Sequence, residues 1–399
     1  MSTVKARMSS VAAQRLVLPL MVGMVVMQLF FAPIGRSVLL GLQLLMMITI
    51  VSLCFQGKAR ICFLFFLMIW GAVAYFNYLN LDMAVSPDAV KYRDYYYTFK
   101  GDPSEFFASI YKEFKESEYY DVSSYSVVAV FFYPVAYWFD DTSIDSVFLI
   151  MNLVFAFGTV FFHWGAIDRL SFRYNRAKKY SFFLWIFSPV VVYHYQVFSK
   201  DIFSCFLCAA SVYFFAGKRL FLGIVFLVLA TMLRPYSVAI IFSIYFFVAD
   251  DAKRLIQGGL ASFVVVVFFA GLDGLINSIL VLLYMPISPN FFSFAVERND
   301  YFPLYMESFT FFLGILFFLI SWSLSKSVRA FSMHCLLAIF IYACVMTVLG
   351  KYSADHYDTV YQVGTMGNNA LRKKIPILPI YISMIVVALS FFGNRELKK

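Results

Sequence analysis

Long apolar runs separated by short polar loops dominate this chain. Runs of about 20 residues, the length that crosses a bilayer as a helix, cover residues 16–35, 37–56, 61–80, 146–167, 181–197, 202–217, 256–284, 304–324, 331–350 and 375–393. Apolar runs of this number and length are typical of membrane helices rather than of a soluble core. The pattern therefore predicts an all-α, polytopic membrane protein that forms a single integral membrane domain over residues 1–399.

Residues 220–252 form an apolar stretch that is too long for one span. A single helix here would be about 50 Å long, against a hydrocarbon core of about 30 Å. It would also place Arg234 near the middle of the bilayer. Proline is well tolerated in the first turn of a helix, and Pro235 follows the arginine. We therefore expect two short spans that meet at residues 233–235. The flanking basic pairs, at 218–219 and 253–254, then lie on the same side of the membrane.

The run at 125–139 is apolar but short, and it contains Pro134. If it crossed the membrane, the basic loop at 169–179 would face outward, against the tendency of lysine and arginine to stay inside. We expect instead an interfacial or re-entrant helix on the outer face. The chain then has about 12 spans and both termini in the cytoplasm. This assignment puts most basic residues inside, with few acidic ones: Asp168, Asp250, Asp251 and Glu396.

The composition supports a membrane protein and excludes several other classes. Hydrophobic residues make up 62% of the 399 positions and charged residues 14%, where a soluble domain has about 25% charged residues. This excludes a soluble enzyme, a nucleic-acid-binding domain and a secreted disulfide scaffold. The net charge of +9 does not indicate nucleic-acid binding, because most of the lysine and arginine residues lie in short loops, where they orient membrane helices. Cys205 and Cys208 lie in an apolar run and favour helix packing, so we expect no metal and no cofactor.

Three longer outer segments, 81–145, 285–303 and 351–374, interrupt the short loops. Long loops in compact proteins are usually functional, although they could simply cap the bundle. In the first segment, Asp88 is followed by Tyr92 and Arg93. A carboxylate here could act as a general base, and the neighbouring side chains could bind sugar hydroxyls and phosphate. The alternative is a capped surface helix with tyrosines at the headgroup level.

A second polar cluster, at 193–201, lies between two apolar runs. Ser199 could cap the following helix, and Asp201 would then suit its positive end. Capping does not explain Lys200, because a cation is disfavoured at a helix start. Ionisable residues at this depth are functional by default. We therefore identify Lys200 as a candidate catalytic residue, and His194, Tyr195 and Asp201 as candidate binding residues.

Arg234 is the strongest single candidate, since it interrupts an apolar stretch. A guanidinium can grip phosphate oxygens with two parallel hydrogen bonds, or it could merely snorkel to lipid headgroups. Arg298 lies in the second outer segment, and His356 and Asp358 lie in the third. The third segment ends in the basic triplet 372–374, which could bind phosphate or anionic headgroups.

Three short motifs carry a resemblance to a known family over about residues 80–250. They are Asp88-x-x-x-Tyr92, Ser199-Lys200-Asp201 and Leu233-Arg234-Pro235-Tyr236, with two apolar helices between the second and the third. In these motifs the chain resembles the Wzy-type polymerases of O-antigen and capsule, and the related EpsG-like proteins, of bacterial inner membranes.

The resemblance implies a GT-C-like fold and a periplasmic active site that polymerises undecaprenyl-pyrophosphate-linked oligosaccharides. It implies the lipid bilayer, a chain-length regulator and a flippase as partners, and no nucleic acid. The expected catalytic residues are Asp88, Lys200 and Arg234. The expected binding residues are Tyr92, Arg93, His194, Tyr195, Asp201, Tyr236, Arg298, His356 and Asp358. Three alternatives remain: a GT-C transferase that uses a lipid-phosphate sugar, an O-antigen ligase, and a transporter without catalysis.

Overall fold

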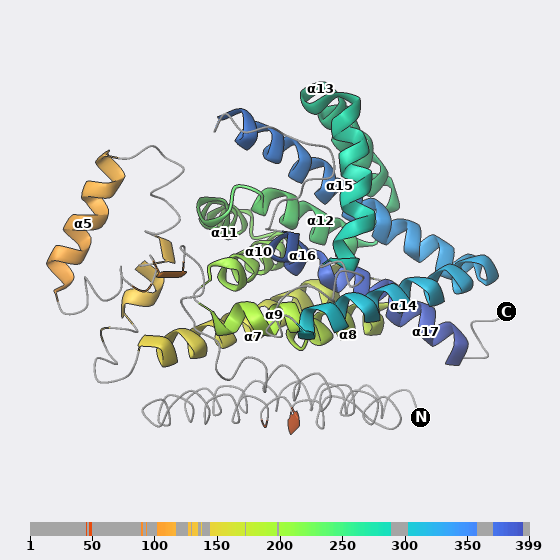
Figure 1. The fold of residues 1–399 in the computed structure, drawn as a ribbon, viewed down its shortest axis with the longest axis horizontal. Coiled ribbons are helices and arrows are strands. Elements are labelled where there is room, and N and C mark those ends of the chain that lie inside the picture. The colour runs from red at the N-terminus through yellow and green to blue at the C-terminus, as the bar shows by residue number, and fades with distance from the viewer. Residues whose placement is uncertain are drawn as a thin grey trace. The chain divides into compact units, whose positions relative to one another are not determined.

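A computed structural model describes residues 102–116, 127–128, 130–134, 144–171, 173–197, 199–288, 302–356 and 370–393, together with a few isolated positions. All regular elements in these ranges are helices, and the described residues contain no strand (Figure 1). The predicted spans at 16–35, 37–56 and 61–80 lie almost entirely outside the described residues.

The helices follow one another with short connections. In chain order they are α5 (Pro103–Glu116), α7 (Ile144–Leu170), α8 (Asn175–Ile186), α9 (Pro189–Gln196), α10 (Asp201–Ala216), α11 (Leu220–Leu233), α12 (Ser237–Ala249), α13 (Ala252–Tyr284), η2 (Met285–Ile287), α14 (Phe302–Leu324), α15 (Lys326–His356), α16 (Ala370–Lys374), η6 (Ile375–Ile377) and α17 (Leu378–Gly393). By its contacts the chain divides into two units. The first is Met1–Val154, Val192–Ser199 and Asn299–Pro303, and the second is Phe155–Val191, Lys200–Arg298 and Leu304–Lys399.

Four helices in the described residues are long and apolar enough to cross a membrane. They cover Phe148–Leu170, Ala252–Ile287, Phe302–Leu324 and Lys326–Tyr352. The apolar helices α10, α11 and α12 are shorter, with 16, 14 and 13 residues. A 14-residue helix is about 21 Å long, which is less than the hydrocarbon core. The described residues are thus those of an α-helical membrane protein with four candidate membrane-spanning helices, and the number of about 12 spans stays a prediction.

The predicted break at residues 233–235 is confirmed. Helix α11 ends at Leu233, and α12 begins at Ser237. Arg234 lies between them with an extended backbone, at φ −145° and ψ 114°. The cause is Pro235, whose ring disfavours the helical conformation for the residue before it. The backbone N–H of Ser237 then donates to the carbonyl of Arg234 at 2.9 Å and closes the turn.

Two predicted element boundaries differ from the structure. The predicted span at 181–197 is divided into α8 and α9, because Pro189 follows Ser188 and disfavours a helical backbone there. Helix α15 runs to His356, beyond the predicted span at 331–350. Neither proline nor glycine occurs from Lys351 to His356, so nothing in that sequence ends the helix where the apolar run ends.

In the first unit, α5 begins after Asp102 and presents one aromatic face. The Asp102 carboxylate accepts a hydrogen bond from the backbone N–H of Ser104 at 2.8 Å and caps the helix. Phe106 stacks on Tyr133 with 3.9 Å between ring centroids. Tyr133 belongs to the run at 125–139, whose described residues 127–128, 130–134 and 137 are helical.

In the second unit, α10 packs against both α11 and α12, while α12 and α13 both pack against α15. Figure 1 shows α13 and α15 side by side. Gly271 bends α13 with φ 69°, a conformation that side chains other than glycine rarely adopt. The contacts of α10 bring its first turn to the turn between α11 and α12, where the candidate site lies.

Candidate functional site

An ion pair joins the start of α10 to the turn between α11 and α12. The Nη2 atom of Arg234 donates to the Oδ1 atom of Asp201 at 2.6 Å. The Asp201 side chain is 4% exposed and that of Arg234 is 16% exposed. Removing both groups from water is costly unless they are paired and hydrogen-bonded. Their pairing fixes the guanidinium at the break that Pro235 produces.

Serine hydroxyls also connect the helices at this junction. The Oγ atoms of Ser204 on α10 and Ser237 on α12 lie 3.2 Å apart. The Ser237 hydroxyl also donates to the carbonyl of Ala230 on α11 at 2.8 Å. All three helices thus meet through buried hydrogen bonds next to the charged pair. The position of Arg234 is therefore set by protein contacts.

A second arginine approaches the same carboxylate from a distant part of the chain. The Nε atom of Arg372, on α16, lies 3.8 Å from the Oδ2 atom of Asp201. Lys373 follows, and burial together with the charge of Arg234 lowers its pKa. The ring of Tyr236 lies 5.9 Å from the Cζ atom of Arg234. Two guanidinium groups thus approach one buried carboxylate, and the Tyr236 ring and the Lys373 amine both interact with Arg234.

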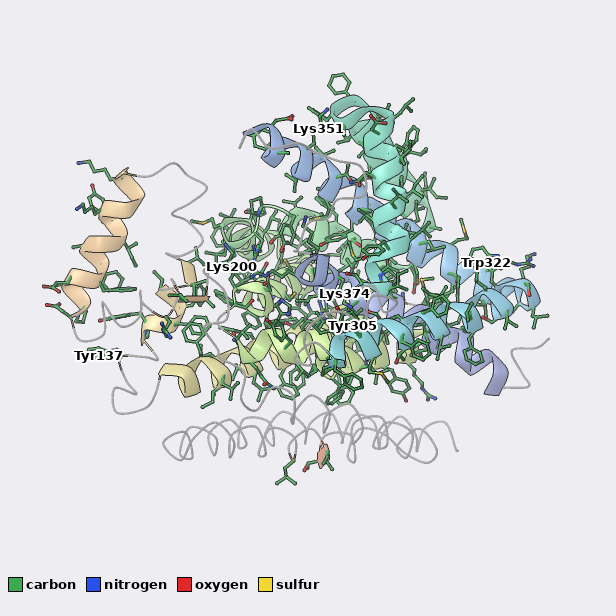
Figure 2. The ribbon with its side chains drawn as sticks, viewed as in Figure 1. Tyr137, Lys200, Tyr305, Trp322, Lys351 and Lys374 are labelled. Carbon is green, nitrogen blue, oxygen red and sulfur yellow. The ribbon has the colours of Figure 1, made fainter. Side chains whose placement is uncertain are left out.

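The side chain of Lys374 contacts a different part of the protein from the side chain of Arg372. Its side chain is fully buried, and its Nζ atom lies 3.1 Å from the Oε2 atom of Glu307 on α14. Figure 2 shows Lys374 among the surrounding side chains. Nζ also donates to the carbonyl of Ser288 at 2.6 Å. The hydroxyl of Ser188 donates to the Oε1 atom of Glu307. The expectation that the whole triplet 372–374 binds phosphate or headgroups is therefore wrong for Lys374, because protein groups surround its amine.

The structure places several predicted site residues together. Arg234, Asp201 and Tyr236 meet at the turn, and Lys200 is the residue before Asp201, at the N-cap of α10. The side chain of Lys200 itself makes no capping hydrogen bond to the helix, and capping by Ser199 stays a prediction. The Asp201 carboxylate forms an ion pair with Arg234, so its role is not limited to an interaction with the positive end of α10.

Other predicted residues lie outside this cluster or outside the described residues. His194 is buried in α9, with its ring 5.1 Å from that of Tyr193, and Tyr195 lies in the same helix. Residues 192–199 and Arg93 belong to the first unit. His356 is the last residue of α15. Four further predicted residues fall outside the described residues: Asp88, Tyr92, Arg298 and Asp358.

Sequence reasoning did not single out the roles of Arg372 and Glu307. The basic triplet 372–374 was a candidate for binding phosphate or anionic headgroups, but nothing in the sequence links Arg372 to Asp201. Glu307 gave a clearer signal, because it lies inside the predicted span at 304–324. An ionisable residue within a span usually has a partner or a function.

The far end of α12 carries a separate buried ion pair. The Nζ atom of Lys178 lies 2.6 Å from the Oδ1 atom of Asp250, and the lysine is fully buried. The other carboxylate oxygen accepts from the Ser171 hydroxyl at 2.8 Å and from the backbone N–H of Arg173 at 2.9 Å. A helix of 13 residues is about 20 Å long. Arg234, Arg372, Asp201 and Tyr236 form what we call the arginine cluster. The second ion pair, at the other end of α12, is thus remote from it.

The arginine cluster fits one kind of chemistry best. Guanidinium groups bind phosphate oxygens with paired hydrogen bonds. Groups held in advance in a site of low water content stabilise charge that develops during a reaction. The cluster can thus receive an anionic phosphate group beside aromatic and hydroxyl-bearing side chains.

No family model matches this chain, and neither a curated protein nor a solved structure matches it.

Proposed function

We propose that this protein is a polysaccharide polymerase of the Wzy type, acting on undecaprenyl-pyrophosphate-linked oligosaccharides at the outer face of a bacterial inner membrane. The observation that carries the proposal is the placement of Arg234 and Arg372 on the single carboxylate of Asp201. This arrangement supports recognition of a multiply charged anion. The leaving group of the proposed reaction, a lipid pyrophosphate, is such an anion.

The proposed reaction exchanges one bond to a sugar for another. A hydroxyl at the non-reducing end of the acceptor repeat attacks the anomeric carbon of the growing chain. The bond from that carbon to the pyrophosphate oxygen breaks, and undecaprenyl pyrophosphate leaves with the electron pair. The hydroxyl proton passes to a general base, for which Asp88 is the candidate.

Each member of the cluster has a proposed part in this reaction. Arg234 and Arg372 neutralise charge on the leaving pyrophosphate, which lowers the barrier without a nucleotide. Asp201 keeps the two guanidinium groups close together against their mutual repulsion. Lys200, at the start of α10, adds a further cation beside the phosphate, and Tyr236 packs against a sugar or a guanidinium.

Glycan analysis of a strain that lacks this protein tests the proposal. A polymerase predicts surface glycans that carry one repeat unit in place of a ladder of lengths, and the wild-type chain should restore the ladder. Loss of all attached repeats would favour a ligase or an earlier transferase. An unchanged ladder would contradict the proposal.

A further inference from the structure

Helix α16 carries Arg372 but is too short to hold its own orientation. It has five residues, Ala370–Lys374, which is less than two turns, and isolated helices of this length are not stable in water. The place of Arg372 must therefore be set by contacts that the rest of the protein makes with this segment.

Those contacts come from several helices and fall on consecutive residues. The hydroxyl of Tyr342 on α15 donates to the carbonyl of Lys373 at 2.7 Å. The indole N–H of Trp185 on α8 donates to the carbonyl of Ile375 at 2.7 Å. The Lys374 amine contacts Glu307 and the carbonyl of Ser288. Only the last of these anchors acts through a side chain of α16.

The geometry of a helix links Lys374 to Arg372. Residues two apart differ by about 200° around the helix axis, so they point to nearly opposite sides. With Lys374 held by Glu307 on one side, Arg372 is turned toward Asp201 on the other. The buried pair thus limits rotation of α16 about its own axis.

A role in stability alone does not account well for this pair. Taking both charges out of water costs several kcal/mol per ion, and apolar residues of similar volume often serve stability equally well. Hydrogen-bonded ion pairs depend more strongly on direction than apolar contacts do. The Glu307 carboxylate is itself held by the Ser188 hydroxyl, so the position of the anion is also defined.

We propose that the buried ion pair between Glu307 and Lys374 is a positioning device that holds α16 so that Arg372 faces Asp201 and Arg234, and that it thereby sets the affinity of the arginine cluster for pyrophosphate. This inference rests on the proposed function, since it assigns the cluster a pyrophosphate ligand. Glu307 and Lys374 act through Arg372 and do not themselves touch the ligand.

The test measures binding of inorganic pyrophosphate to the purified full-length protein by calorimetry. The main variant is Glu307→Gln/Lys374→Met, which removes both charges together and leaves no unpaired buried ion. The matched control is Asp250→Asn/Lys178→Met, which does the same to the remote buried pair. Each double variant is measured alone and combined with Arg372→Gln, and thermal unfolding is recorded for every protein.

We expect Glu307→Gln/Lys374→Met to weaken pyrophosphate binding by about tenfold, which corresponds to about 1.4 kcal/mol. We expect the control pair to change binding less than about twofold, within the additivity of distant sites. Combined with Arg372→Gln, the loss of the Glu307–Lys374 pair should have almost no further effect, because its influence runs through Arg372. The control should behave in the same way in both backgrounds.

Two results would overturn the inference while leaving the proposed function standing. One is wild-type affinity in the Glu307→Gln/Lys374→Met variant. The other is an equal loss with and without Arg372→Gln. If wild-type protein binds no pyrophosphate, both this inference and the proposed function fail. Glu307→Asp decides the matter if the double variant does not fold: it keeps both charges but shortens the carboxylate side chain that holds Lys374. It should weaken binding only while Arg372 is present, and unchanged affinity in that variant would refute the inference.

Discussion

Arg234 and Asp201 lie 33 positions apart in the chain, yet their side chains are joined by a hydrogen bond of 2.6 Å. The pair connects the start of α10 to the turn after α11, so it forms only when these helices have assembled. An arginine that merely snorkels to headgroups needs no protein partner. The pairing with a buried carboxylate supports a guanidinium whose direction matters.

The first prediction concerns the shape of that guanidinium. Arg234→Lys keeps the charge but replaces a planar fork by a point charge. If the fork binds pyrophosphate in the transition state, the polymerisation rate should fall on the order of a hundredfold, as for loss of one oriented donor. The measurement is the rate of chain extension at equal protein level.

Arg169→Lys is the control for this substitution. Arg169, on α7, also donates a hydrogen bond of 2.7 Å to the Tyr213 hydroxyl and lies 3.9 Å from the centroid of the Tyr213 ring. Tyr213 is at the opposite end of α10 from Asp201. This variant should polymerise at nearly the wild-type rate. Full activity of Arg234→Lys would remove Arg234 as a specific phosphate ligand.

The second prediction concerns the carboxylate that two arginines share. Asp201→Asn leaves Arg234 and Arg372 facing each other without the anion between them. Breaking a buried pair costs about 3–5 kcal/mol, and the partial exposure of both arginines favours the lower end. Thermal unfolding should show this loss, and added pyrophosphate should restore part of it. Unchanged stability would mean that the ion pairs contribute little.

The third prediction concerns Arg372, which the structure adds to the site. Arg372→Ala should raise the KM for the lipid-linked donor and lower the rate, because one of two guanidinium groups is lost. Arg329→Ala is a suitable comparison, since Arg329 is exposed near the start of α15. Steady-state kinetics with both variants provide the check. Equal kinetics for the two would exclude Arg372 from substrate binding.

The sequence predicted parts of this arrangement for clear physical reasons. The break around Arg234 was predictable because proline constrains the residue before it. The extra length of α15 was not, since the end of an apolar run does not end a helix. The meeting of Arg372 with Asp201 depends on packing between distant helices, and no local pattern encodes it. Glu307 could have been found from its place in an apolar run.

The fourth prediction concerns topology, which rests on the charge distribution. Lys115→Cys on α5 should react with a membrane-impermeant thiol reagent from outside the cell, and Arg176→Cys on α8 should not. Both positions are exposed in the structure. The native cysteines of the described residues, at 205, 208, 335 and 344, are buried and should give little background. Labelling at position 176 would mean that residues 125–139 cross the membrane.

Reconstitution of the reaction tests the central claim most directly. Purified protein in lipid vesicles is supplied with one undecaprenyl-pyrophosphate-linked repeat unit and no nucleotide, and the products are resolved by length. The proposed function predicts lipid-linked oligomers of increasing length together with free undecaprenyl pyrophosphate, and it predicts that Arg234→Lys abolishes most of both. Wild-type protein that leaves the repeat unit unchanged, or that moves it intact across the vesicle membrane, would contradict the account.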